Sequence, residues 1–405
     1  MYTIRPLEIV CQREFQATTS GSGVSTIDTL HCKAFLLEGA LPETTRRCRL
    51  PRFRSDLEAI PTYDPGRPSA EIAAELGLEA IIGMADNECP TEPFPEVEEA
   101  IAAAASSINR YPLSDASHLV AALADHYRVE KDRLWVGPGS TGILTTIALA
   151  ASGSSTSVIF GDPSFVVYRM ATLLAGADPI PVPLDTEWRL DPEAMLGAIR
   201  PDTTLIYFCN PNNPTGTHRS SDDVERLVAA VPDSITVVID EAYAEYVTAA
   251  DYATAIPLIM ERDNVVVSRT FSKIYGLAGA RIGYALGDPN TIRSLRRLQF
   301  PFATGALAQA AATEALRHQD RVQERVAANS AGRGFLTDEL HRLDQSVIAS
   351  QTNFVLWRPE SDPAGLASRL LNLGIMVRAM GPWIRVTVGT EAENKKLIDS
   401  LTELL

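Results

Sequence analysis

The chemistry available to this 405-residue chain centres on one lysine, Lys273, in the stretch "RTFSKIYGLAGARIGY" (residues 269–284). Lysine is rare here, with five lysines against 31 arginines, and Lys273 is the one lysine between Lys131 and Lys395. Arginine stays protonated at physiological pH, whereas a lysine can lose its proton when its surroundings lower its pKa. Lys273 is therefore a candidate for covalent or proton-transfer chemistry, although a solvated loop lysine also fits the sequence.

Other polar side chains follow short apolar runs of the kind that form buried strands. The turn at residues 137–142, "GPGSTG", follows "RLWV" and precedes a helix-like segment. Ser140 and Thr141 would then lie at a helix N-terminus, where free N–H groups and the helix dipole suit a phosphate. The remaining candidates at the ends of such runs are Phe165, Asn213, Asp240, Tyr243, Thr270 and Ser272.

These residues are predicted to meet, because ligands in open α/β sheets bind beyond the carboxyl ends of the strands. Taken singly, each one equally fits a turn, a cap or a rim aromatic. Together they place a phosphate-binding turn, an aromatic ring, an amide, a carboxylate with a tyrosine, and a lone lysine at one rim. This set suits pyridoxal 5′-phosphate, because the lysine can form a Schiff base and the carboxylate can keep the pyridine nitrogen protonated.

The apolar pattern predicts the elements that would position this rim. Helical spacing covers residues 69–82, 95–108 and 114–127, and strands then alternate with helices up to about residue 273. These strands are too uniformly apolar to be half-exposed, which favours a largely parallel sheet covered on both faces. After residue 300, long helical segments precede short strands at 352–358, 374–380 and 383–389 and a last helix at 391–405, which indicates a smaller α+β domain.

The motifs resemble the fold-type I pyridoxal-phosphate enzymes, and within the class I and II aminotransferases they are closest to the histidinol-phosphate aminotransferase family. "NPNNPTG", "VVIDEAYAEY", "RTFSKIYGLAGARIGY", "TNFVLWR" and "IRVTVGT" follow the family's order, and "DNECP" and "NRYP" extend the match upstream. The resemblance covers roughly residues 65–405. It implies a three-layer α/β fold with a mainly parallel central sheet and a smaller α+β C-terminal domain. The expected division is an N-terminal extension at 1–60, a small domain at 61–95 and 300–405, and a large cofactor-binding domain at 96–299.

The resemblance also implies a role for each matching residue in the reaction. Lys273 would be the Schiff-base lysine and, once released by substrate, the general base of the proton shift, for which its pKa must be lowered. Asp240 would pair with the pyridinium nitrogen. Asn213 and Tyr243 would hydrogen-bond the cofactor's 3′-oxygen, and Phe165 would stack on its ring.

Further implied roles concern the cofactor phosphate, the partner subunit and the substrate. Tyr111 would reach the cofactor phosphate of a second subunit, which implies a homodimer with shared active sites. Arg385 would bind the substrate α-carboxylate bidentately, and Asn353 would support that end. Arg378 fits either an anionic substrate group or a solvated strand-end charge. The phosphate ligands would be Ser140, Thr141, Thr270, Ser272 and Arg281.

Three departures from the histidinol-phosphate aminotransferase pattern leave the amino donor open. Cys89 lies in the "DNECP" segment, where the family usually has an aromatic residue or asparagine. The stretch from Arg378 to Arg385 is short and carries Trp383. The extension of about 60 residues is also atypical.

Composition excludes several other classes of protein. The net charge of −15 argues against a general nucleic-acid binder and against an anionic membrane surface. No apolar run is long enough to span a bilayer, and the N-terminus lacks a secretory pattern. The five cysteines show no CxxC or metal-type spacing, so reduced thiols and a cytoplasmic location are expected. The six histidines are scattered, so no metal site is expected.

The function favoured is a pyridoxal-phosphate-dependent aminotransferase that moves an amino group between an amino acid or similar amine and a 2-oxo acid. The alternative is an enzyme of specialised metabolism that uses the same cofactor for decarboxylation or for elimination and replacement at Cβ or Cγ, because the scaffold is shared and the periphery selects the product. A non-catalytic binding protein is disfavoured because Lys273, Asp240 and Arg281 occur together.

Overall fold

The structure of the protein is a computed structural model, and it describes residues 55–62 and 67–405. The predicted N-terminal extension at 1–60 lies almost wholly outside the described residues, as do Cys11, Cys32 and Cys48. Residues 58–405 form one compact unit. Within the described ranges, no helix has both the length and the apolar character needed to cross a membrane, and no cluster of His, Cys, Asp or Glu side chains could hold a metal ion.

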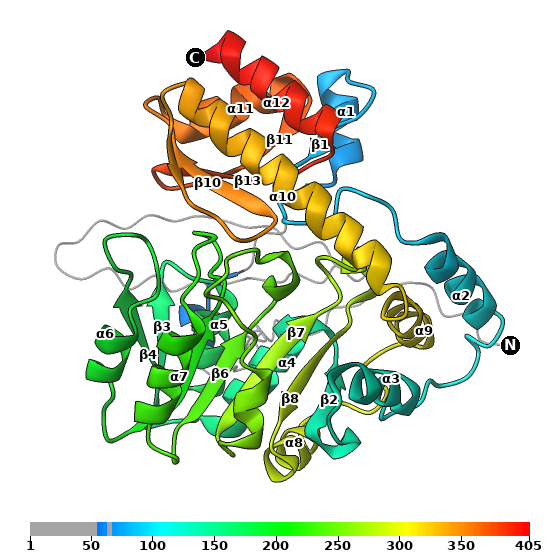
Figure 1. The fold of residues 1–405 in the computed structure, drawn as a ribbon, viewed down its shortest axis with the longest axis vertical. Coiled ribbons are helices and arrows are strands. Elements are labelled where there is room, and N and C mark those ends of the chain that lie inside the picture. The colour runs from blue at the N-terminus through cyan, green and yellow to red at the C-terminus, as the bar shows by residue number, and fades with distance from the viewer. Residues whose placement is uncertain (1–54, 63–66) are drawn as a thin grey trace, which may run out of the picture. The chain divides into compact units, whose positions relative to one another are not determined.

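A seven-stranded sheet with the order β2-β8-β7-β6-β5-β3-β4 forms the centre of the fold (Figure 1). Neighbouring strands are parallel, except that β8 is antiparallel to both β2 and β7. The prediction of a mainly parallel central sheet is therefore confirmed. The strands are β2 (Leu134–Gly137), β3 (Ser157–Asp162), β4 (Asp178–Pro183), β5 (Thr203–Cys209), β6 (Thr236–Asp240), β7 (Val265–Thr270) and β8 (Gly283–Gly287).

Strand β8 was not predicted from the sequence. Its sequence "GYALG" begins and ends with glycine, a residue that is depleted in strands. The glycine at 283 has a structural reason, because a Cβ atom there would lie 2.8 Å from the carbonyl oxygen of Arg269 and 3.0 Å from the nitrogen of Ser140. The absence of a side chain at Gly283 thus lets β8 lie close both to β7 and to the start of the helix that begins at Gly139.

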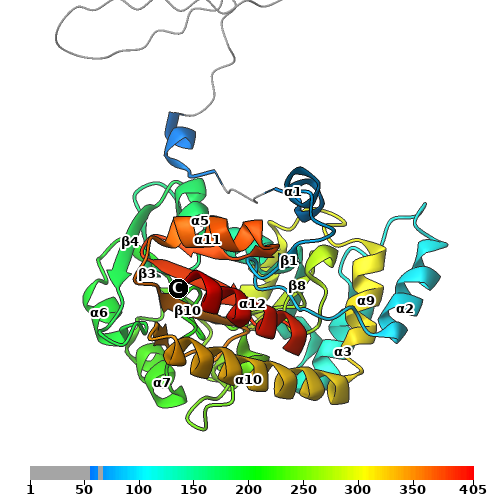
Figure 2. The ribbon, with the colours of Figure 1, turned by 90° about the horizontal axis from the view of Figure 1, so that it is seen from above.

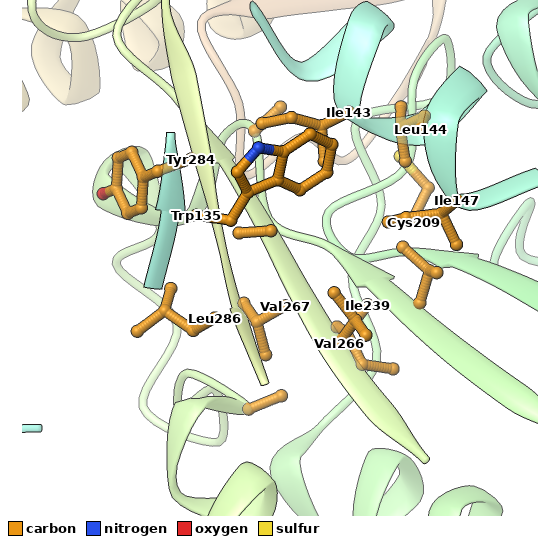
Figure 3. Packing of buried hydrophobic residues seen from close by; sticks show 14 of the residues in the cluster. Trp135, Ile143, Leu144, Ile147, Cys209, Ile239, Val266, Val267, Tyr284 and Leu286 are labelled. Carbon is orange, nitrogen blue, oxygen red and sulfur yellow. The ribbon is translucent and has the colours of Figure 1, made fainter. Parts of the chain in front are cut away.

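Helices flank the central sheet, and the hydrophobic core lies between the helices and the sheet. Helix α4 packs against α5 and against strands β7 and β8. Figure 3 shows Ile143, Leu144 and Ile147 of α4 beside Val266 and Ile239 of the central strands, all of them buried. The helices of this part are α2 (Pro95–Ala105), α3 (Ser117–Tyr127), α4 (Gly139–Ala151), α5 (Val167–Ala175), α6 (Pro192–Gly197), α7 (Ser221–Ala230), α8 (Pro289–Arg296) and α9 (Ala306–Ala315).

A second, smaller core belongs to the C-terminal part of the chain. Its four-stranded antiparallel sheet has the order β12-β13-β10-β9, and β1 and β11 form a separate parallel pair. Figure 2 shows α10 running beside α12, and the two helices pack together. The elements are α1 (Ser69–Leu76), β1 (Ile82–Gly83), α10 (Gln319–Arg342), β9 (Ser346–Ile348), β10 (Phe354–Arg358), α11 (Pro363–Asn372), β11 (Ile375–Met376), β12 (Arg378–Met380), β13 (Trp383–Thr387) and α12 (Glu391–Leu404).

Several predicted elements have different limits in the structure, and two of the differences have a clear physical reason. The helix predicted at 69–82 ends at Leu76, because Gly77 adopts a left-handed conformation with φ of 67° and caps the helix. The strand predicted at 374–380 divides at Val377, since β11 pairs with β1 whereas β12 pairs with β13. The predicted division of the chain at residues 96 and 300 stays a prediction.

Five short 3₁₀ segments complete the described fold, and two of them adjoin the carboxyl end of the central sheet. Segment η3 follows β6 and Tyr243, and η5 precedes Arg281. The 3₁₀ segments are η1 (Ser55–Ala59), η2 (Lys131–Arg133), η3 (Ala244–Tyr246), η4 (Ile256–Met260) and η5 (Ala278–Ala280).

Candidate active site

Lys273 lies just beyond the carboxyl end of β7, as the sequence predicted. Its Nζ donates hydrogen bonds to the main-chain oxygens of Asn87, at 3.0 Å, and of Asp86, at 3.4 Å. Burial and, after it, the nearby guanidinium of Arg385 lower the pKa of the Lys273 amine to about 8, against the opposing effect of Glu88 and Asp86. A substantial neutral fraction is thus available near neutral pH, which chemistry at a lysine amine requires.

Asp240 is the last residue of β6 and is buried. Oδ2 accepts a hydrogen bond of 2.7 Å from the hydroxyl of Tyr168, whereas Oδ1 is buried and has no hydrogen-bond partner among the described residues. Burial raises the pKa of the Asp240 carboxyl to about 6, although the Tyr168 hydroxyl and the amide of Ala242 favour the ionised form. A buried oxygen that lacks a donor fits a ligand that brings an N–H group to it, as a protonated pyridine ring would.

The predicted phosphate ligands gather at the start of α4. Gly139, the first residue of this helix, has φ of +73°, and a Cβ atom there would lie 2.8 Å from Nη2 of Arg281. Arg281 Nη1 donates to the Ser272 hydroxyl at 3.4 Å, and the Thr270 hydroxyl donates to the same oxygen at 3.0 Å. Ser140 and Thr141 follow Gly139 in the first turn. Hydroxyls, a guanidinium and helix N–H groups thus converge, which is the donor set that a phosphate monoester needs.

Asn213 and Tyr243 are joined to the same site through their polar atoms. Oδ1 of Asn213 accepts a hydrogen bond of 2.7 Å from Nη1 of Arg385, and the Tyr243 hydroxyl accepts one of 3.1 Å from Nδ2 of Asn87. Nζ of Lys273 lies 5.7 Å from the centre of the Tyr243 ring. The structure therefore brings together lysine, tyrosine, amide and arginine from four separate segments.

Phe165 lies between β3 and α5 and is partly exposed. Its ring packs edge-on against Tyr168, with ring centroids 5.8 Å apart and planes at 88°. Because Tyr168 is bonded to Asp240, the Phe165 ring is fixed close to the carboxylate. The donor set, the unpaired Oδ1 of Asp240 and the partly exposed aromatic ring all fit pyridoxal phosphate.

Comparison with known proteins assigns the family. The family model of aminotransferase class I and II matches residues 79–401. The chain belongs to the class I and II aminotransferases. It is 36% identical to the histidinol-phosphate aminotransferase of Moorella thermoacetica, over 88% of this chain and 94% of that one. It is 40% identical to the aromatic amino acid aminotransferase of Rhodococcus jostii, over 85% of this chain and 93% of that one.

A solved structure gives the same assignment for the fold. The histidinol-phosphate aminotransferase of Sinorhizobium meliloti in complex with pyridoxal-5′-phosphate aligns with a TM-score of 0.81 and 27% identity, covering 88% of this chain and 100% of that one. The fold-type I prediction and the cofactor prediction are confirmed. This aminotransferase is a pyridoxal-phosphate-dependent transferase that acts on amino acids and 2-oxo acids, and the alternative outcomes of the cofactor's chemistry are not favoured by its relatives.

One wall of the site in this aminotransferase comes from the segment that contains "DNECP", which the sequence singled out without revealing its contacts. The main-chain oxygen of Ala85 accepts a hydrogen bond of 2.8 Å from Arg385 Nη2, and those of Asn87 and Glu88 accept from Asn353 Nδ2 at 3.1 and 3.3 Å. The main-chain N–H of Asn87 donates a hydrogen bond of 2.9 Å to Thr387 Oγ1. Asn353 and Arg385 thus hold this segment in place as well as lining the site. Cys89, in the same segment, has its Sγ 3.3 Å from Oγ1 of Thr91.

Of the two remaining predicted site residues of the aminotransferase, Arg378 lies beside the site and Tyr111 lies apart from it. Nη2 of Arg378 forms an ion pair of 2.6 Å with Oδ1 of Asp86, so this arginine is not a simply solvated strand-end charge. Tyr111 is not brought to the other site residues by any contact among the described residues. Its ring is 82% exposed and stacks on Phe302, with centroids 4.4 Å apart.

Proposed function

We propose that Lys273, Asp240 and Arg385 form the reacting centre of this aminotransferase. Pyridoxal phosphate supplies, when bound, an electron sink that makes the Cα–H bond of the substrate acidic. Lys273 would hold the cofactor and then carry the proton at Cα, Asp240 would keep the pyridine nitrogen protonated, and Arg385 would bind the α-carboxylate. The observation that carries this proposal is the lysine amine of lowered pKa in the same site as the buried carboxylate with an unpaired Oδ1.

The position of Lys273 supports its role in moving a proton. An amine with a pKa of about 8 is partly neutral at cytoplasmic pH, so it can both accept and return a proton. Its hydrogen bonds to the main-chain oxygens of Asn87 and Asp86 hold Nζ in one place, and neither acceptor is a carboxylate. Burial and the positive charge of Arg385 act in the same direction.

The surroundings of Arg385 support its role in binding a carboxylate. The side chain is 8% exposed, and its two terminal nitrogens are oriented by Asn213 Oδ1 and the Ala85 carbonyl. A guanidinium held in one plane can present a fork to a carboxylate, with less conformational entropy to lose on binding. Asn353 would act indirectly, because it fixes the neighbouring segment at Asn87 and Glu88.

The other predicted residues would bind the cofactor. Phe165 would cover its ring, and Asn213 and Tyr243 would bind its ring oxygen. The donor set at the start of α4 would bind its phosphate: Ser140, Thr141, Thr270, Ser272 and Arg281.

A spectral titration tests this proposal. Amino acids added singly to the yellow holoenzyme should discharge its visible absorbance in one stoichiometric half-reaction, with release of the matching 2-oxo acid. Lys273→Ala should abolish turnover. Arg385→Gln should raise the amino acid concentration needed for half-saturation by about 30- to 100-fold, because a charge-assisted bidentate contact is lost.

The matched control for Arg385→Gln is Arg358→Gln, at the exposed end of β10. This variant removes one positive charge from the neighbouring strand. It should leave the amino acid concentration needed for half-saturation unchanged. The proposal is wrong if no amino acid discharges the absorbance, or if the two arginine variants behave alike.

We further propose that the aminotransferase is a homodimer in which Tyr111 serves the partner's site. The support is a set of exposed apolar side chains among the described residues, each close in the sequence to Tyr111 or to its stacking partner Phe302. Tyr111 and Phe300 are each 82% exposed, and Ile108 is 65% exposed. Leu113 and Phe302 are less exposed, at 44% and 41%. A phenolic hydroxyl on such a surface can reach a phosphate in a second subunit.

Subunit mixing tests the shared site. Lys273→Ala and Tyr111→Phe subunits, each impaired alone, would form hybrids with one site that combines an intact Lys273 with an intact Tyr111. Activity should therefore rise above the sum of the two parents after unfolding and refolding together. No gain on mixing would mean that Tyr111 acts within its own subunit or not at all.

We also infer a cytoplasmic location. The support is the reduced state expected of its cysteines, since both cysteines among the described residues, Cys89 and Cys209, are free thiols. Recovery of the enzyme from a non-cytoplasmic fraction of the source cell would contradict this inference.

A further inference from the structure

Two arginines lie directly opposite each other on the small sheet. Arg378 of β12 is paired with Arg385 of β13 in the antiparallel register, so the two side chains project from the same face. Two like charges in this arrangement repel each other unless an acceptor separates or neutralises them. The two guanidinium groups differ in the charge of the groups that bind them.

Arg385 is bound by neutral acceptors, the amide oxygen of Asn213 and the carbonyl of Ala85. Arg378 is instead bound by a full negative charge, since its Nη2 lies 2.6 Å from Oδ1 of Asp86. Asp86 belongs to the wall of the site, because its own main-chain oxygen lies 3.4 Å from Nζ of Lys273. The carboxylate that neutralises Arg378 therefore belongs to the segment that accepts hydrogen bonds from the Lys273 amine.

The ion pair remains accessible to a substrate. The side chains of Arg378 and Asp86 are 31% and 38% exposed, whereas Arg385 is 8% exposed. Side chains alternate between faces along a strand, so Met380 and Trp383, which pair with each other, lie on the same face as the two arginines. The face beyond the ion pair is thus apolar.

We propose that Asp86 is a specificity determinant that closes Arg378 to anionic substrate groups. The substrate class is amino acids with uncharged, apolar or aromatic side chains, rather than amines that carry a phosphate. This inference rests on the proposed function of the same site. A phosphate at Arg378 would have to displace the Asp86 carboxylate and then lie beside it, and the repulsion between these two anions opposes binding. An uncharged substrate side chain can bind beside the Arg378–Asp86 ion pair and the apolar residues next to it, because it is not repelled by the Asp86 carboxylate.

The test compares two amines on the holoenzyme, with phenylalanine and histidinol phosphate as probes. The wild-type enzyme should give a dissociation constant for histidinol phosphate at least about tenfold weaker than that for phenylalanine, from spectral titration. Asp86→Asn should strengthen histidinol phosphate binding by about tenfold and change phenylalanine binding by less than about threefold. Adding Arg378→Gln to Asp86→Asn should remove this gain.

A second readout uses inorganic phosphate as a competitor of phenylalanine. The inhibition constant of phosphate should be lower in Asp86→Asn than in the wild-type enzyme. In the double variant it should rise again to the wild-type value. The matched control is Glu92→Gln, which removes one negative charge from an exposed side chain further along the chain and should leave the preference between the two amines unchanged.

The outcomes separate the two proposals. If neither amine, nor any other amino acid, discharges the holoenzyme absorbance, the proposed function fails. If phenylalanine reacts but histidinol phosphate binds equally well or better in the wild-type enzyme, the role of Asp86 is overturned. The same holds if Glu92→Gln shifts the preference between the two amines as much as Asp86→Asn does.

Discussion

The hydroxyl of Tyr168 donates a hydrogen bond of 2.7 Å to Oδ2 of Asp240, and both side chains are buried. Burial raises the pKa of Tyr168 well above its ordinary value, and the adjacent carboxylate adds to this effect, so the hydroxyl stays protonated and acts as a donor. The Tyr168 ring is fixed in turn by stacking on Tyr207, with centroids 4.7 Å apart. Tyr168 thus orients Asp240 and leaves Oδ1 as the acceptor for an incoming N–H group.

Replacing Tyr168 by phenylalanine should weaken cofactor binding. The hydrogen bond is made to an ionisable group in a buried site, so its loss should raise the dissociation constant of pyridoxal phosphate by about 10- to 100-fold. The pKa of Asp240 should rise as well, because the hydroxyl favours the ionised form. Fluorescence titration of the apoprotein with pyridoxal phosphate at several pH values measures both effects.

Tyr207→Phe is the matched control for Tyr168→Phe. Its hydroxyl is also buried, and it donates a hydrogen bond of 2.7 Å to the main-chain oxygen of Leu144 rather than to Asp240. The control loses the same atom from an adjoining ring, so it should lose stability but keep its cofactor affinity. Equal losses of affinity in the two variants would show that Tyr168 contributes only to packing.

Asp240 should destabilise the apoprotein. Its folded-state pKa of about 6 lies above the ordinary value of about 3.9, so ionisation opposes folding. The stability of the wild-type apoprotein relative to Asp240→Asn should therefore fall as pH rises from about 4 to about 6, and then stay level. The difference on the plateau is expected to be about 1–3 kcal/mol in favour of Asp240→Asn.

Urea unfolding of both apoproteins at pH 5 and pH 8 measures this difference. Asp240→Asn should at the same time lose most of its transamination, because an amide cannot hold the pyridine nitrogen protonated. An Asp240→Asn apoprotein that is less stable than wild type at pH 8 would refute the assignment of Asp240 as a strained, functional carboxylate.

The site residues that the sequence revealed are those attached to strand ends. Asp240 ends β6 and Lys273 follows β7, which are parallel neighbours, and uniformly apolar strands are visible in a single sequence. The carboxyl ends of parallel neighbours meet at one edge, so their proximity follows from the topology. The same reasoning located the turn before α4.

The residues that the sequence did not reveal reach the site by tertiary packing. Asp86 and Asn87 lie in a segment without helical or strand periodicity, 187 and 186 residues from the Lys273 that they contact. Tyr168 lies in α5, where its spacing is that of an ordinary core residue, and only its position beside Asp240 reveals a role. The signal available was the "DNECP" motif, which indicated a functional segment but not its contacts.

Asn87 should contribute through its side chain and not only through its backbone. Its φ of 55° lies in the left-handed region, which asparagine and glycine tolerate. Asn87→Gly therefore keeps the backbone but removes the hydrogen bond from Nδ2 to the Tyr243 hydroxyl. We expect kcat/KM to fall about tenfold in Asn87→Gly with little change in Tm.

Asn87→Ala provides the comparison for this prediction. It loses the same hydrogen bond and must also hold alanine in the left-handed region, which costs about 1 kcal/mol of stability. Its Tm should therefore lie below that of Asn87→Gly, with a similar loss of activity. Wild-type kcat/KM in Asn87→Gly would show that only the main chain of this residue matters.

The lowered pKa of Lys273 predicts how the apoprotein captures its cofactor. Only the neutral amine reacts with an aldehyde, so the rate of covalent capture, measured by borohydride trapping, should rise with pH with a midpoint near 8 and then level off. Arg385→Gln removes a positive neighbour that opposes protonation, so the midpoint should move to higher pH. Arg317→Gln, which removes an exposed arginine paired with Glu314, should leave the midpoint in place. A wild-type midpoint near 10.5, the ordinary value for lysine, would show that neither burial nor Arg385 activates Lys273.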